Sequence, residues 1–158
     1  MKALAALPLL ALLLGQAVQA AVPDQQAVAS AHPTATEAGH LILDQGGNAF
    51  DAAIAVAATL AVVEPYGSGI GGGGFFLLRL NGEQGTDYRF LDARETAPQA
   101  AHRNLYLDDD NQLQRVINGP LAAGIPGLPA ALVHLAQRYG QLPLQQSLAP
   151  AVAAAEAG

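Results

Sequence analysis

The spacing of hydrophobic and polar residues predicts a helix near the start of the chain. Apolar positions recur three or four residues apart over residues 34–45, which is the period of one helical face. Thr34 followed three residues later by Glu37 fits a capping box, and a glycine pair beginning at Gly46 supplies a stop. We therefore expect a helix capped by Thr34 and preceded by a short strand over residues 28–31.

A second helix is predicted over residues 49–63, where nearly every position is apolar. Asn48 and Asp51 stand three residues apart, the spacing of an N-terminal cap. Pro65 disfavours helical geometry at the residue before it, so the helix is expected to end there. Because apolar residues lie on every face of this helix, we expect neighbouring segments to cover it all round.

Two strands and two further helices follow a glycine-rich stretch. Residues 75–80 are a hydrophobic run and residues 87–93 form a second strand, with a turn expected at the Asn-Gly pair of residues 81–82. A loop punctuated by glycine and proline then leads into the helical patterns of residues 130–139 and 144–156.

The first twenty residues have the three-part pattern of a secretory signal peptide. Lys2 gives a positive start, residues 3–14 are almost entirely apolar, and Val18 and Ala20 are small residues at the two positions that signal peptidase reads. The apolar run is shorter than the ~20 residues that a membrane-spanning helix needs. We expect cleavage after Ala20, no stable membrane anchor, and a periplasmic or secreted protein. Residues 21–158 are then expected to form a single, incomplete structural unit.

Composition narrows the classes of partner. Lys2 is the only lysine, so six arginines face thirteen acidic residues after cleavage, which gives a net charge of −7. Such a surface repels phosphate backbones, so nucleic acid is not an expected partner. Only 13% of residues are charged and 51% are hydrophobic, which argues against disorder and suggests a surface partly covered by other chain. The absence of cysteine excludes disulfides and a thiol nucleophile.

The glycine-rich stretch contains the spacing Gly-x-Gly-x-x-Gly at Gly69, Gly71 and Gly74. As a dinucleotide fingerprint, this motif must follow a strand and open a helix, so that the pyrophosphate meets the helix N-terminus. Here the predicted order is helix, glycines, strand. We interpret the glycines instead as positions where the backbone takes a positive φ or passes close to another segment or a ligand.

No metal or cofactor site is expected. Asp108, Asp110 and Asn111 resemble the start of a calcium loop, but its sixth and twelfth positions hold Leu113 and Gly119 in place of glycine and glutamate. A solvated turn is the better interpretation. No serine lies in a nucleophile elbow, and the histidines show no metal-like pairing; they are His32, His40, His102 and His134.

Arg94 is the sharpest candidate for a binding residue. It leaves a predicted strand and enters a loop stopped by Pro98, a place where a scaffold often presents a ligand contact. Its planar guanidinium can hold a carboxylate through two parallel hydrogen bonds. The alternative is a structural ion pair with Asp92 or Glu95, and the residues by themselves leave both interpretations open.

Several separate motifs, in the right order, resemble the start of the large subunit of γ-glutamyltransferases, also called γ-glutamyltranspeptidases or glutathione hydrolases. The resemblance covers nearly everything from residue 28 onward. The matching stretches are QGGNA at 45–49, DAA at 51–53, EP at 64–65, GSGIGGGGF at 67–75, DARETAP at 92–98, GIPG at 124–127, YG at 139–140 and LAPA at 148–151.

The resemblance implies an α+β fold that is an incomplete part of an N-terminal nucleophile hydrolase, a four-layer αββα sandwich made as a precursor that cuts itself. Cleavage would expose the threonine of a small subunit, which attacks the γ-glutamyl amide of glutathione and related compounds and passes the acyl group to water, an amino acid or a peptide. Arg94 falls on the family's arginine for the α-carboxylate of the donor. The implied partners are these substrates, the rest of the large subunit and the small subunit.

The same resemblance places the catalytic threonine beyond Gly158, so we expect a fragment that is inactive by itself. The internal threonines would not become an N-terminus, since the first residue after signal removal is Ala21; they are Thr34, Thr36, Thr59, Thr86 and Thr96. Two alternatives remain open. One is a related acylase of the same fold acting on β-lactam side chains or poly-γ-glutamate, and the other is a non-catalytic truncated or degenerate copy.

Overall fold

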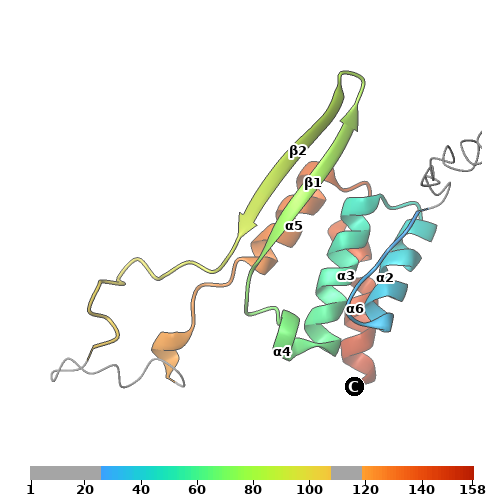
Figure 1. Cartoon of the computed structure of the whole chain (residues 1–158). Helices are drawn as coiled ribbons and strands as arrows, with labels where there is room; N and C mark the ends of the chain where they lie inside the picture. The colour runs from blue at the N-terminus through green and yellow to red at the C-terminus, as the bar shows by residue number, and fades with distance from the viewer. Residues whose placement is uncertain (1–25, 108–118) are drawn as a thin grey trace, which may run out of the picture.

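A computed structural model describes residues 26–107 and 119–158 (Figure 1). The predicted signal peptide and the Asp108–Asn111 turn lie outside these residues. Figure 1 shows α2, α3 and α6 side by side as one helical layer, with α5 between α3 and a long hairpin. The elements are α2 (Pro33–Asp44), α3 (Ala49–Val63), α4 (Pro65–Ser68), β1 (Gly74–Gly82), β2 (Gly85–Ala93), η1 (Pro120–Ala122), α5 (Leu128–Tyr139) and α6 (Leu144–Ala157).

Helix α3 begins and ends where the sequence predicts, because its caps are local. The Asn48 side chain accepts hydrogen bonds from the backbone amides of Phe50 at 2.8 Å and Asp51 at 3.1 Å. In return, the carboxylate of Asp51 accepts from the Asn48 amide at 2.9 Å, which completes a capping box. Glu64 closes the other end and precedes a proline, as expected.

The start of α2 corrects two expectations. Its N-cap is His32 and not Thr34: the His32 Nδ1 accepts from the Thr34 amide at 3.2 Å, and Pro33 occupies the first helical position. Proline there is already set at a helical φ, so the helix starts two residues earlier than expected. Residues 28–31 form no strand, because the only sheet of the described residues consists of β1 and β2 and offers them no partner.

The hairpin pairs β1 with β2 in antiparallel register from Gly74 opposite Ala93 to Gly82 opposite Gly85. The turn lies at residues 83–84, two positions later than the predicted Asn-Gly turn. Gly85 explains this shift, because its φ of +118° is a backbone conformation that other residues rarely adopt.

The two faces of the hairpin have different surroundings. Phe76, Leu78 and Leu91 lie on the face that packs against the helices. On the opposite face, the exposed side chains include Leu77 and its cross-strand partner Phe90, which are 73% and 65% exposed. A face with this many uncovered apolar side chains is rare on a soluble monomer. The hairpin therefore leaves one hydrophobic face uncovered.

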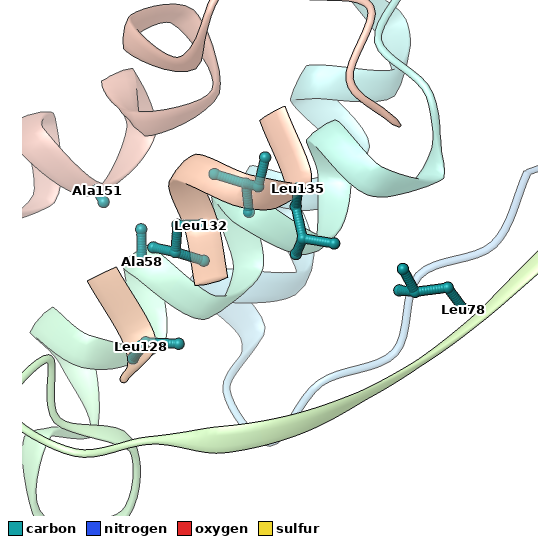
Figure 2. Packing of buried hydrophobic residues seen from close by; sticks show 7 residues of the cluster. Ala58, Leu78, Leu128, Leu132, Leu135 and Ala151 are labelled. Atoms are coloured by element: carbon teal, nitrogen blue, oxygen red, sulfur yellow. The ribbon is translucent and has the colours of Figure 1, made fainter. Parts of the chain in front are cut away.

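The core lies where α5 meets α3, α6 and the inner face of β1 (Figure 2). Three leucines of α5 at helical spacing, Leu128, Leu132 and Leu135, point into it. A second, smaller cluster joins α2 to α3 through Ile42 and Ala55. Both clusters depend on α3, which is therefore the central helix of the molecule.

The expectation that α3 is buried all round is only partly met. Six of its fifteen residues are buried. Its remaining apolar face, which includes Ala53, Val56 and Leu60, lines an open groove of about 640 Å³ beside the segment that precedes α2. The groove is bordered by that segment and by Leu43 and Phe76, and these α3 side chains are half-buried. No described helix combines the length and the apolar character that a membrane span requires.

Candidate functional site

Three segments that are distant in sequence meet where β2 ends. The first is the segment that follows β2, and the second is the loop before α5. These two pair through Thr96 and Ile125, which exchange backbone hydrogen bonds of 3.2 and 2.9 Å. The third is the glycine loop before β1, whose Gly72 carbonyl accepts from the amides of Gly127 and Leu128, both at 3.2 Å. Figure 1 shows the end of β2 and the starts of β1 and α5 at one place.

Arg94 emerges from this junction with its side chain exposed. Its backbone amide donates to the Asp92 carboxylate at 3.0 Å, a short-range turn that fixes the chain as it leaves β2. The guanidinium forms no ion pair with either of its acidic neighbours, Asp92 or Glu95. Of the two interpretations left open by the sequence, the structural ion pair is therefore absent from this structure.

The glycines of the junction are needed because they lack a side chain, and not because they adopt unusual dihedral angles. Among the described residues, positive φ values occur only at Gly46, Gly85 and Gly158, so none of the glycines from Gly69 to Gly74 adopts one. The order of elements is α4, glycines, β1, as expected, so the glycines open a strand and not the helix that a dinucleotide fingerprint requires. The glycines instead allow the close approach of backbone segments.

Sequence reasoning identified Arg94 and expected the glycine run to pass close to another segment, but it singled out none of Gly72, Gly73 and Gly127. The only sequence feature that pointed to them was the set of motifs GSGIGGGGF, DARETAP and GIPG, which is non-local. Their proximity becomes visible only in the folded chain.

The threonines all lie inside the chain. Thr59 is wholly buried within α3, and Thr96 is tied to Ile125 by backbone hydrogen bonds. Thr36 contacts Ser30 through its hydroxyl at 2.7 Å, and Thr86 donates to Asn81 at 3.1 Å. Thr34 belongs to the first turn of α2. Each hydroxyl is thus placed within a helix, a strand or a bridge.

The hairpin carries an ion pair between Arg89 and Asp87. The Asp87 carboxylate, 2.7 Å from the Arg89 Nε, raises the pKa of Arg89 above its usual value, first through the hydrogen bond and then through its charge. Both side chains are more than half exposed, so the pair contributes little to stability. Within residues 26–107 and 119–158, no group of three or more histidine and carboxylate side chains is arranged to hold a metal ion.

Comparison with solved structures defines the class of protein. The chain superimposes on γ-glutamyltranspeptidase from Pseudomonas nitroreducens complexed with L-DON with a TM-score of 0.75 and 40% identity, over 82% of this chain and 38% of that one. It also superimposes on cephalosporin acylase from Bacillus halodurans, with a TM-score of 0.69 and 34% identity over 86% and 27% of the two chains. The fold is α+β and forms part of an N-terminal nucleophile hydrolase.

Sequence comparison gives the family. The family model described as γ-glutamyltranspeptidase matches residues 35–158. A glutathione hydrolase proenzyme of Pseudomonas aeruginosa is 42% identical over 141 residues, which are 88% of this chain. The chain belongs to the γ-glutamyltranspeptidase family. It spans 25% of the length of that relative.

Proposed function

We propose that this chain is part of an enzyme that cleaves the γ-glutamyl amide of glutathione and related compounds and transfers the glutamyl group to water, an amino acid or a peptide. The observation that carries the proposal is the position of Arg94. It is exposed at the junction of three backbone segments and makes no ion pair with Asp92 or Glu95. A planar cation carried on a backbone that hydrogen bonds hold suits a donor that carries an α-carboxylate.

In this proposal, Arg94 orients the donor and another part of the enzyme performs the attack. Two parallel hydrogen bonds from the guanidinium hold the α-carboxylate, so that the γ-amide carbonyl lies in a defined place. A threonine hydroxyl attacks that carbonyl, its own N-terminal amine takes the proton, and the amine leaving group departs with a proton. Water or an amino acid then attacks the glutamyl ester, releases glutamate or a new γ-glutamyl product and frees the threonine.

We assign the nucleophile to protein outside these 158 residues. The internal threonines serve as helix, strand and bridge residues, and the family resemblance requires a threonine that becomes an N-terminus by self-cleavage. The relative from Pseudomonas aeruginosa carries the name proenzyme, which supports a precursor. We further propose that residues 1–20 direct export and that the enzyme works in the periplasm or outside the cell.

A second candidate function is favoured by one comparison. The similarity to the cephalosporin acylase makes an amidase for β-lactam side chains an alternative on the same fold. The two functions differ in whether the donor has an α-carboxylate that Arg94 can bind. A γ-glutamyl donor supplies an α-carboxylate next to its α-amino group, whereas a side-chain acyl group without that carboxylate leaves the arginine without a partner.

The test compares Arg94→Ala and Arg94→Lys in the full-length enzyme with two donors, one carrying and one lacking the α-carboxylate. Loss of the bidentate pair is expected to cost ~2–5 kcal/mol of transition-state binding with the carboxylate donor, by analogy with truncated charge pairs. At ~1.4 kcal/mol per tenfold change, this is a roughly thirty- to several-thousandfold fall in kcat/KM. Arg94→Lys keeps the charge but loses the two-point geometry, so it should retain only part of the kcat/KM that Arg94→Ala loses.

The control is the donor without the carboxylate, for which both variants should lose little. Equal losses with both donors, together with a lower melting temperature, would mean that Arg94 is structural. A wild-type enzyme that prefers an acyl donor without the carboxylate would favour the acylase function instead.

A further inference from the structure

The peptide unit between Ala93 and Arg94 is enclosed by two glycines from different segments. A Cβ placed on Gly127 would overlap the carbonyl oxygen of Ala93 and come within 2.6 Å of its carbonyl carbon. A Cβ on Gly73 would overlap the same oxygen and come within 2.8 Å of the Arg94 Cα. Real Cβ atoms do not approach backbone this closely, so any other residue at either position must displace the chain that carries Arg94.

This restriction is specific to these positions. Gly74, the immediate neighbour of Gly73, would have nothing within 4 Å of an added Cβ, and its φ is not in the left-handed region. Gly124 is restricted to a lesser degree, since its Cβ would lie 2.9 Å from the Cβ of Glu95, an atom whose position is fixed by the backbone. The junction therefore contains glycines that the available space requires, above all Gly73 and Gly127, and one that it does not, Gly74.

Hydrogen bonds hold the two glycines in place around the peptide. The Gly72 carbonyl accepts from the Gly127 amide at 3.2 Å, so the residue next to Gly73 is tied directly to Gly127. The bridge between Thr96 and Ile125 closes the other side. Because both loops are fixed to each other, neither can retreat freely from a new side chain, and Arg94 must move instead.

We propose that Gly73 and Gly127 are positioning residues that set the place of the Arg94 guanidinium for the α-carboxylate of a γ-glutamyl donor. The inference rests on the proposed function of Arg94. The physical reason is that a shift of the Arg94 backbone moves the guanidinium with it. A hydrogen-bond geometry with two contact points tolerates little displacement. A misplacement of about 1 Å can cost on the order of a hundredfold in rate.

The experiment uses the full-length enzyme with Gly73→Ala, Gly127→Ala and the matched control Gly74→Ala, each in the wild-type and in the Arg94→Ala background. kcat/KM is measured with a donor carrying the α-carboxylate and with one lacking it. We expect the first two variants to lower the preference for the carboxylate donor by about ten- to a hundredfold. Gly74→Ala should change it less than about twofold, because its Cβ has free space.

The Arg94→Ala background separates positioning from packing. If the glycines act through Arg94, alanine at either position adds less than about a twofold loss of kcat/KM once the arginine is gone. Equal losses in both backgrounds, while Arg94→Ala itself keeps its donor-selective effect, would overturn the inference and leave the proposed function intact. If Arg94→Ala affects both donors equally, the proposed function fails and the inference fails with it.

Gly124→Ala provides a milder variant in case alanine at residue 73 or 127 prevents folding or self-cleavage. Its overlap is the smallest of the three, a single contact of 2.9 Å with the Glu95 Cβ, so a smaller backbone displacement and a folded enzyme are expected. The expected result is a smaller loss, about two- to tenfold, again only with the carboxylate donor and only when Arg94 is present. A folded Gly124→Ala enzyme with unchanged donor preference would count against the inference.

Discussion

The carboxylate of Asp51 lies against Gly140, so closely that a Cβ on this glycine would come within 2.6 Å of the Asp51 Oδ1. Asp51 is wholly buried and also accepts from the Gln141 amide at 2.9 Å and the Leu142 amide at 3.4 Å. Asn48, its partner in the capping box, donates through its side chain to the Tyr139 carbonyl at 2.7 Å. The cap of α3 therefore also holds the connection between α5 and α6.

Removal of this carboxylate should destabilise the protein by more than a surface change. Asp51→Ala removes a wholly buried carboxylate and leaves the part-buried amides of Asn48 and Gln141 without their acceptor, which is expected to lower the free energy of unfolding by about 1–3 kcal/mol in total. The measurement is a urea denaturation curve of the full-length protein. Asp44→Ala, on the exposed end of α2, is the control and should stay within about 0.5 kcal/mol. Similar midpoints for the two variants would contradict this role of Asp51.

The central position of α5 predicts a strong contrast between two of its residues. Leu135 has no exposed surface and lies between α3 and α6, so Leu135→Ala should cost about 2–5 kcal/mol of unfolding free energy. Val133 lies on the same helix and is 39% exposed, so Val133→Ala should cost about 0.5 kcal/mol or less. The same denaturation experiment compares them. A loss at Val133 equal to that at Leu135 would show that the outer face of α5 is covered in the full-length protein.

The exposed hairpin face predicts that the 158-residue chain by itself folds poorly and associates. Leu77 and Phe90 expose most of their surface, and the two strands have open edges. Changing both to threonine keeps strand propensity and should reduce the apparent mass in light scattering. Leu78→Thr, on the buried face, should not have this effect. A monomeric wild-type chain with a sharp cooperative transition and slow amide exchange would refute the prediction.

The 158-residue chain is also expected to show no γ-glutamyl hydrolase or transferase activity. The reason is chemical, because the proposed nucleophile is a threonine at a new N-terminus and the five threonines of this chain lie inside it. The assay is turnover of a γ-glutamyl chromogenic amide by the purified chain. Activity that disappears when one of these threonines is replaced would disprove the assignment.

Export is expected to remove the first twenty residues. The basic start, the apolar run and the small residues before Ala21 match the pattern read by signal peptidase. N-terminal sequencing of protein isolated from the cell envelope should begin at Ala21. Protein that retains Met1 and stays in the cytoplasm would contradict both the cleavage and the proposed location.

Local physics explains what the sequence by itself determined. Asn48 and Asp51 are three residues apart, so the capping box and the bounds of α3 follow from neighbouring residues. The leucines of α5 lie at helical spacing, and Gly140 follows its last turn. The hydrophobic run of residues 75–80 likewise predicted a strand, but its apolar residues do not alternate with polar ones, so which face is buried was decided by the packing. Arg94 was identified from its chemistry and from motifs that match a family.

Only the tertiary structure decided which distant segments meet. Nothing within a few residues of Arg94 reveals that Gly73 and Gly127 enclose its backbone, because these contacts join three segments far apart along the chain. The N-cap of α2 at His32 and the shifted hairpin turn were missed for a related reason, since several caps and turns compete locally with small energy differences. Close packing selects among such alternatives, because backbone segments can approach this closely only where no side chain intervenes.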